Sequence, residues 1–162
     1  MPLYTNTTKG TVAYTSGTRL TKILPNDVTI QSSATLTEQA ELTIDLGPNE
    51  RISFRYNIFW QTTPDGDFKY LVNIPASINF YRNTRTGVDP SGAEVSEAPI
   101  LAEGSEVGLA RSDNPSNGYL GLEGVLENGS TADSLKFTWA QNSSHASDTT
   151  LLRGSSVEYI RF

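Results

Sequence analysis

One stretch of the chain alternates apolar and polar residues so regularly that it leaves little choice besides an extended strand. Between Arg51 and Gln61 the residues of one parity are apolar, namely Ile52, Phe54, Tyr56, Ile58 and Trp60. Successive side chains of a strand point to opposite faces, so this pattern predicts a strand with one buried face. Phe59 is the single apolar residue out of phase. No window of the chain has a convincing helical period.

A turn signal follows this stretch and leads into a second alternating run. Residues 63–67 read Thr-Pro-Asp-Gly-Asp, and the period of two then resumes at Phe68, Tyr70, Val72 and Ile74. Proline presets φ and glycine tolerates positive φ, so Pro-Asp-Gly between two alternating runs indicates a turn. The pattern predicts an antiparallel hairpin over residues 51–74.

Weaker runs of the same kind flank the predicted hairpin. They lie at Val28 and Ile30; at Leu42, Ile44 and Leu46; at Ile78 and Phe80; at Leu120 and Leu122, with Val125 near them; at Leu135, Phe137 and Trp139; and at residues 157–162. Residues 35–40 fit either one helical turn or extended structure. About eight strands separated by turn signals predict an all-β fold, an antiparallel β-sandwich of jelly-roll type.

The length of 162 residues fits one domain. Two regions do not have the strand-and-turn pattern expected of a β-sandwich. Residues 1–19 are rich in Thr and Gly and predict an extended N-terminal arm. Residues 83–118 are rich in Gly, Ser, Pro and Glu, and predict a long irregular insertion within a sandwich domain of residues 20–162. Long connections inside compact domains are usually functional or disordered.

Charge and composition argue against several classes of partner. Twelve Lys and Arg against eighteen Asp and Glu give a net charge of −6, and the basic residues are scattered. We therefore expect binding neither to nucleic acid nor to anionic membranes. The chain has no cysteine, which fits folding in a reducing compartment. The first residues lack the pattern of a signal peptide and no stretch reaches the length of a membrane span, so we expect synthesis in the cytoplasm.

Catalytic patterns are weak throughout the sequence. His145 is the only histidine, and it lies among serines three residues before Asp148. A Ser-His-Asp triad needs a nucleophile on a strained turn and an oxyanion hole, and residues so close in sequence seldom adopt that geometry. We interpret this segment as a polar loop. The acids of the irregular segment that could pair for glycoside hydrolysis are better explained as solvated or interface charge; they are Glu94, Glu97, Glu103 and Glu106. We expect no enzyme.

Oxygen ligands for calcium could come from Asp65 and Asp67, with Asp27 or Asp45 as further donors. The spacing of an EF-hand is absent, and Asp-Gly-Asp is a common turn sequence. We expect neither a metal site nor a cofactor, although a structural cation at a trimer axis stays open at this point.

Several apolar residues lie outside the pattern of the core and are candidates for an interface with a partner: Leu3, Tyr4, Val12, Tyr14, Ile100, Leu101 and Tyr119. Exposed aromatic residues favour protein interfaces or stacking on sugars, and they also cap the ends of sandwiches. A role in binding and a role in capping the sandwich are equally supported for four aromatic residues: Tyr4, Tyr14, Phe59 and Tyr119. Trp60 and Trp139 share the phase of the core, so neither offers a stacking platform.

Two parts of the chain together resemble a known group of proteins. One part runs from Asp-Val-Thr-Ile at residues 27–30 to Leu-Thr-Ile at 42–44, then through Tyr-Asn-Ile-Phe-Trp at 56–60 to Asp-Phe-Lys at 67–69 and on to Pro75. The other, more specific part is Leu-Lys-Phe-Thr-Trp-Ala-Gln-Asn-Ser at residues 135–143 with the Gly-Ser-Ser-Val ending at 154–157. This arrangement resembles small β-sandwich proteins of the virions of tailed bacteriophages. The likeness leaves out the N-terminal arm and the middle segment.

The resemblance implies a structural role in the particle and no catalytic residues. Its first implication is a capsid decoration (cement) protein that binds the outside of the head, often as a homotrimer, with the major capsid protein or other virion proteins as partners. The protein would then lie on the capsid surface after synthesis in the host cytoplasm. The alternatives are a receptor-binding domain of a tail fibre or head fibre, and a carbohydrate-binding module.

Overall fold

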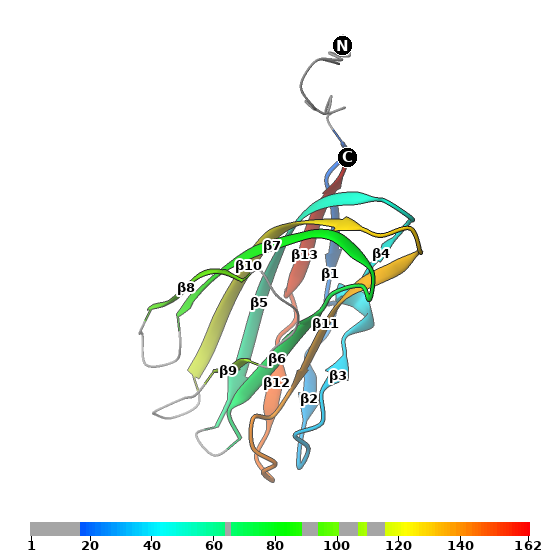
Figure 1. The fold of residues 1–162 in the computed structure, drawn as a ribbon. Coiled ribbons are helices and arrows are strands. Elements are labelled where there is room, and N and C mark those ends of the chain that lie inside the picture. The colour runs from blue at the N-terminus through cyan, green and yellow to red at the C-terminus, as the bar shows by residue number, and fades with distance from the viewer. Residues whose placement is uncertain (1–16, 64–65, 89–93, 101–106, 110–115) are drawn as a thin grey trace, which may run out of the picture.

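The computed structural model describes residues 17–63, 66–88, 94–100, 107–109 and 116–162. Their backbone forms two antiparallel β-sheets that face each other across one core, as the all-β sandwich prediction requires (Figure 1). The strands are β1 (Leu20–Ile23), β2 (Val28–Ile30), β3 (Thr37–Glu38), β4 (Ile44–Leu46), β5 (Arg51–Thr62), β6 (Phe68–Asn73), β7 (Ile78–Val88), β8 (Glu94–Ile100), β9 (Val107–Leu109), β10 (Ser116–Asn128), β11 (Asp133–Ala140), β12 (Thr149–Leu151) and β13 (Ser156–Arg161), with the 3₁₀ turn η1 (Ala40–Leu42) before β4.

The larger sheet has eight strands, and its main path runs β1-β13-β5-β10-β7-β8. Strand β5 lies at its centre, paired with β10 along one edge and with β13 and then β12 along the other. The second sheet has five strands, with the order β3-β11-β6-β9 and β4 paired to β11. The jelly-roll connection of these strands remains a prediction.

Aromatic side chains fill the space between the sheets. Phe68 of the smaller sheet is fully buried and stacks on Trp60 of the larger sheet, with ring centroids 5.0 Å apart. Trp139 lies 5.9 Å from Phe68, and Tyr56 packs against Phe137 across the core. Trp60 and Trp139 are therefore core residues, as their phase in the sequence predicts.

Glycines of β10 make room for the large rings of β5. Gly118 lies opposite Trp60 in the register, and a Cβ at residue 118 would overlap the indole ring. Gly124 lies opposite Phe54, and a Cβ there would lie 2.8 Å from Phe54 Cζ. Each ring thus covers the bare backbone of a glycine on the neighbouring strand, which locks the register of the two longest strands.

The predicted hairpin over residues 51–74 is wrong, although both of its strands exist. Strands β5 and β6 do not pair with each other, because β5 belongs to the larger sheet and β6 to the smaller one. The connection is an arch between sheets, where Asp67 has a φ of 49° and its carbonyl accepts hydrogen bonds from the hydroxyls of Thr62 and Thr149. Both strands are apolar on one face, and the arch turns these faces toward each other.

The irregular insertion expected at residues 83–118 is also wrong for much of its length. Strand β7 continues to Val88, β8 occupies Glu94–Ile100 and β9 occupies Val107–Leu109. Strands β8 and β9 pair through their backbones with β7 and β6, and backbone pairing does not require an apolar alternation in the sequence. The N-terminal arm lies outside the described residues except for residues 17–19. Within the described part of the chain, no helix is long and apolar enough to cross a membrane.

Candidate functional site

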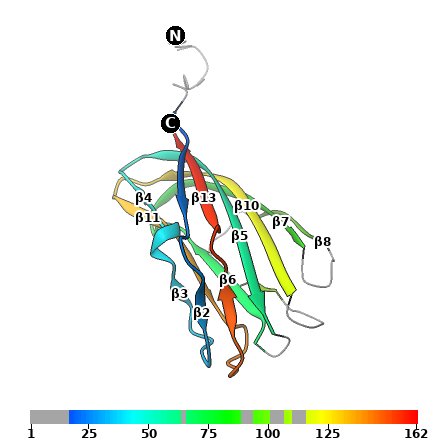
Figure 2. The same cartoon turned by 180° about the vertical axis from the view of Figure 1, so that it is seen from behind.

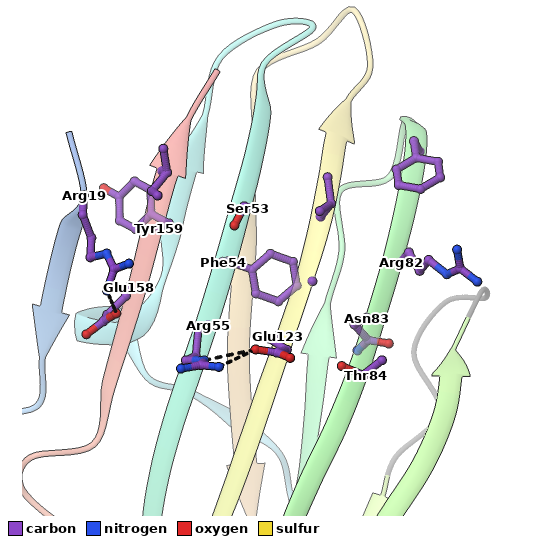
Figure 3. A pocket seen from close by; sticks show the side chains of 14 residues that line it. Arg19, Ser53, Phe54, Arg55, Arg82, Asn83, Thr84, Glu123, Glu158 and Tyr159 are labelled. Atoms are coloured by element: carbon purple, nitrogen blue, oxygen red, sulfur yellow. Dashed lines mark hydrogen bonds and ion pairs between the residues drawn. The ribbon is translucent and has the colours of Figure 1, made fainter. Parts of the chain in front are cut away.

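The outer face of the larger sheet, on the side away from the core, carries a groove of about 580 Å³ (Figure 3). It extends over four neighbouring strands, β13, β5, β10 and β7. Ser53 is a small residue on the outward face of β5. Its cross-strand partners Val125 and Ile160 have larger side chains on either side of it. A small side chain between two larger ones creates the hollow. We call this the outer groove.

One end of the outer groove is apolar and open to solvent. Phe80, Val125 and Phe162 are 46 %, 36 % and 41 % exposed. Together with Arg51 they line an adjoining hollow of about 500 Å³. Monomeric proteins expose few clusters of large apolar side chains, and such clusters mark binding surfaces more often than the rest of the surface does.

The other end of the groove is bounded by a row of alternating charges. Arg19 donates a hydrogen bond to Glu158 at 3.0 Å, and Arg55 donates to Glu123 at 2.6 Å. Register places Arg55 directly between Glu158 and Glu123, so the row alternates in sign from Arg19, just before β1, across the three strands β13, β5 and β10. The hydrogen bond and charge of Glu123 raise the pKa of the Arg55 guanidinium.

A further ion pair lies at the apolar end. Arg51 Nε donates a hydrogen bond to Glu127 Oε2 at 2.9 Å. This bond, helped by the charge of Arg51 and a contact from Asn79, lowers the pKa of the Glu127 carboxyl. Both long side chains are held in place, so they form a fixed polar rim beside the exposed Phe80.

The chemistry of the outer groove is that of a binding surface. Four of its charged groups form the pairs Arg19–Glu158 and Arg55–Glu123, Arg82 also lines it, and its floor combines a serine hydroxyl with aliphatic and aromatic carbon. Across the described residues, no group of three or more His, Asp or Glu side chains could hold a metal ion. An apolar patch with a fixed charged rim suits a protein segment of complementary shape.

Of the interface residues predicted from the sequence, Tyr119 can be placed with its side chain. It packs on Phe59, with ring centroids 5.4 Å apart, and its hydroxyl donates to Asn57 Oδ1 at 3.1 Å. This aromatic pair lies on the same outer face as the groove but outside its lining. Ile100 ends β8, and its side chain is not described. The remaining predicted residues lie outside the described residues: Leu3, Tyr4, Val12, Tyr14 and Leu101.

Sequence reasoning missed the apolar residues of the groove. Leu120, Leu122 and Leu126 share the inward phase of β10, whereas Val125 has the opposite phase. Phe80 similarly precedes the buried Tyr81. The sequence signal that could have found them is an apolar residue out of phase with the buried face of its strand. The same signal singles out Phe59.

The segment around His145 has the geometry of a local loop. The ring Nδ1 of His145 accepts a hydrogen bond from the backbone N–H of Ser147 at 3.1 Å, and it lies 3.0 Å from the Ser147 hydroxyl. The His145 backbone N–H donates to Gln141 Oε1. The imidazole thus orders its own turn.

The acids weighed as ligands are dispersed. Asp27 accepts a hydrogen bond from the Arg153 backbone N–H at 2.7 Å, and Asp45 is exposed on β4. Asp65, Glu103 and Glu106 lie outside the described residues, and the side chains of Glu94 and Glu97 are not described either.

No protein-family model matches the chain, and no curated protein sequence matches it. Among solved structures, that of infectious bursal disease virus, Gt strain, aligns at a TM-score of 0.25 and 11% identity, over 99% of this chain and 45% of the other. The Gx strain structure aligns at a TM-score of 0.23 and 11% identity, over 99% and 40%. The D431N mutant of the VP2 protein of the same virus aligns at 0.23 and 11%, over 99% and 43%. The chain spans less than half of each, and similarity at this level assigns neither family nor function.

Proposed function

We propose that this chain is a structural protein of a virus particle, which acts by binding other virion proteins through the outer face of its larger sheet. The observation that carries this proposal is the exposed apolar cluster of Phe80, Val125 and Phe162 beside a rim of paired charges. Burial of apolar surface drives association, and charges already paired in the free protein cost little to bring to an interface.

The finer form of the proposal is a decoration protein on the head of a tailed bacteriophage. It is supported by the sequence resemblance, which covers residues 27–162 without the middle segment, and the homotrimer implied by that resemblance is part of it. Many copies on one shell would turn modest single contacts into firm retention.

The test is binding to particles that lack the protein. Purified chain is mixed with heads assembled without it, the particles are sedimented, and bound chain is located by negative-stain microscopy. We expect chain on the outer surface of the head. Absence from the pellet, or density only at a fibre tip, would overturn the decoration role.

Two variants test whether binding to the particle depends on the outer groove. Phe80→Ser removes an exposed aromatic ring from the outer groove and should lower the amount bound at a fixed concentration by about tenfold, the equivalent of one well-buried anchor. Ala146→Ser changes an exposed residue in the loop after β11 and is the matched control, with binding equal to wild type.

A second candidate function rests on the aromatic pair Phe59 and Tyr119. Phe59 is 40% exposed, and the hydroxyl of Tyr119 is fixed by Asn57, so an aromatic face lies beside an amide. Sugars bind to such combinations. A receptor-binding domain would therefore lose adsorption to host cells in a Phe59→Ser variant while keeping its place on the particle.

A further inference from the structure

Three neighbouring strands of the larger sheet carry most of the charges around the outer groove. Strands β5, β10 and β7 lie side by side in this sheet (Figure 2). On the outward side, β5 presents Arg51 and Arg55, β10 presents Glu123 and Glu127, and β7 presents Arg82. The described outward side chains of these three strands thus include three arginines but only two acids.

Both acids are bound by the arginines of β5. Arg55 donates two hydrogen bonds to Glu123 Oε2, at 2.6 Å from Nη2 and 3.2 Å from Nε. Arg51 Nε donates to Glu127 Oε2 at 2.9 Å. These two pairs run across the same pair of strands, one on each side of the cross-strand pair that forms the floor of the groove. The acids of β10 are therefore already engaged in the free protein.

Arg82 is the cation that these pairs leave over. Register places it opposite Val125, so Glu123 and Glu127 are only its diagonal neighbours. Among the described residues, no side chain forms an ion pair with its guanidinium, which is exposed on the β7 side of the groove (Figure 3). The exposed ring of Phe80 lies two residues away on the same face of β7. A partner that covers Phe80 and Val125 therefore also reaches Arg82.

Contact with a partner takes water away from this charge. An unpaired guanidinium that loses water costs free energy, whereas a carboxylate can compensate by accepting two parallel N–H···O bonds from it. The whole chain has a net charge of −6, so its total charge does not attract an acidic partner. Recognition of an acid on this surface has to be local, at the one cation that is not already paired.

Resting on the proposed function, which makes the outer groove a protein-binding surface, we propose that the partner segment in the groove carries a carboxylate that binds Arg82. Apolar side chains of the segment pack on Phe80 and Val125, and an Asp or Glu beside them accepts hydrogen bonds from the guanidinium. The apolar contact supplies most of the affinity, and the carboxylate determines which segment is accepted.

Charge substitutions test this pair in the assay with heads assembled without the chain. At low salt we expect Arg82→Gln to bind about fivefold more weakly than wild type, and Arg82→Glu at least about twentyfold more weakly. Added salt should narrow both differences, because it screens a pair at the rim of an interface. Arg153→Gln removes an exposed arginine outside the lining of the groove and is the matched control, with binding equal to wild type.

Zero-length coupling tests whether the carboxylate touches residue 82. Arg82→Lys keeps the positive charge and supplies an amine, which a water-soluble carbodiimide joins only to a carboxylate in contact with it. On decorated heads we expect a covalent adduct with a virion protein that neither wild type nor Arg153→Lys forms. Mass spectrometry should place the new amide between residue 82 and an Asp or Glu of that protein.

The outcomes separate this inference from the proposed function. Binding that falls in Phe80→Ser but is unchanged in Arg82→Gln and Arg82→Glu would overturn the carboxylate and leave the binding surface standing. An Arg82→Lys variant that decorates heads fully and forms no adduct at residue 82 would have the same consequence. Failure of wild type to bind heads would instead overturn the proposed function, and this inference with it.

Discussion

The two sides of the larger sheet are built on the same strands but obey different constraints. On the inner side, rings of β5 lie directly over glycines of β10, and no further atom fits between Trp60 and Gly118. On the outer side, the same two strands hold spaced ion pairs and a groove over Ser53. One side is specified by close packing, and the other leaves surface unfilled.

Side chains on the inner side are therefore required for the fold, whereas side chains on the outer side are available for binding. A change on the inner side must displace backbone or an aromatic ring, because the interior of a protein is close-packed. A change on the outer side alters contacts that water or a partner can replace. The predictions below test this contrast, beginning with the largest expected loss of stability.

Phe68→Ala should cost the most stability, because Phe68 joins the two sheets through stacking on Trp60 and also stacks on Trp139 of its own sheet. Removal of a fully buried ring lowers the free energy of unfolding by about 4 kcal/mol. Urea denaturation measures this loss. The matched outer-side variant is Phe59→Ala, which gives up an exposed ring paired with Tyr119 and should cost about 1 kcal/mol. Similar losses for the two variants would contradict the contrast; Phe68→Leu serves if the alanine variant does not fold.

Gly118→Ala should come next, because its Cβ would overlap the ring of Trp60. Overpacking of this kind costs about 2 kcal/mol, and the shifted indole should also change the near-ultraviolet circular dichroism. Gly121→Ala is the control on the same strand and the opposite face, where the Cβ would lie 2.8 Å from the hydroxyl at the far end of the Tyr119 side chain, which can shift at the expense of its hydrogen bond to Asn57. We expect it to cost less than about 1 kcal/mol. Equal costs would show that strand geometry, and not the covering ring, demands glycine at residue 118.

Glu127→Gln should have the smallest effect, with a distinctive dependence on pH. The pKa of Glu127 is lowered in the folded protein by Arg51, so the pair stabilises the fold above the carboxyl's unfolded pKa. This contribution, about 0.5 kcal/mol for a partly exposed pair, is lost as the pH falls through the folded pKa. Stability curves of wild type and variant should therefore differ at neutral pH and converge in acid. A difference that persists in acid would show that the amide perturbs packing instead of charge.

Alternation in the sequence predicted strands better than it predicted their partners. The buried residues of β5 and β6 follow a period of two, because each strand has one face on the core; in β11 only the large apolar side chains do, since its last four residues are all buried. The period does not say which strand lies alongside, so a short turn between two alternating runs indicated a hairpin where the chain forms an arch. The packing of the two sheets against each other depends on contacts such as that of Trp60 with Phe68, and no local sequence pattern contains these contacts.

The site was predictable only in part, for a related reason. Tyr119 was singled out as an aromatic residue beyond the core pattern, and it does lie on the outer face beside Phe59. The groove itself needs Ser53, Val125 and Ile160 side by side, and these come from three strands whose register is set by tertiary packing. Strand β8 was missed because its sequence carries no clear apolar alternation, and β9 because its three residues, with Val107 and Leu109 in phase, are too few to form a pattern; pairing with β7 and β6 reveals them.

The arch between β5 and β6 also determines when the protein can fold. No strand adjacent in sequence pairs with β5; its partners are β10, β12 and β13, the last of which ends at Arg161. A chain emerging from the ribosome therefore displays β5 with both edges unpaired until β10 appears, and with one edge unpaired until β12 and β13 appear. Closure of such distant pairs is slow compared with a local hairpin, and unpaired strand edges invite aggregation. Native pairing of β5 must wait for these later strands, so the yield of native protein depends on how well β5 is kept from other chains until they are made.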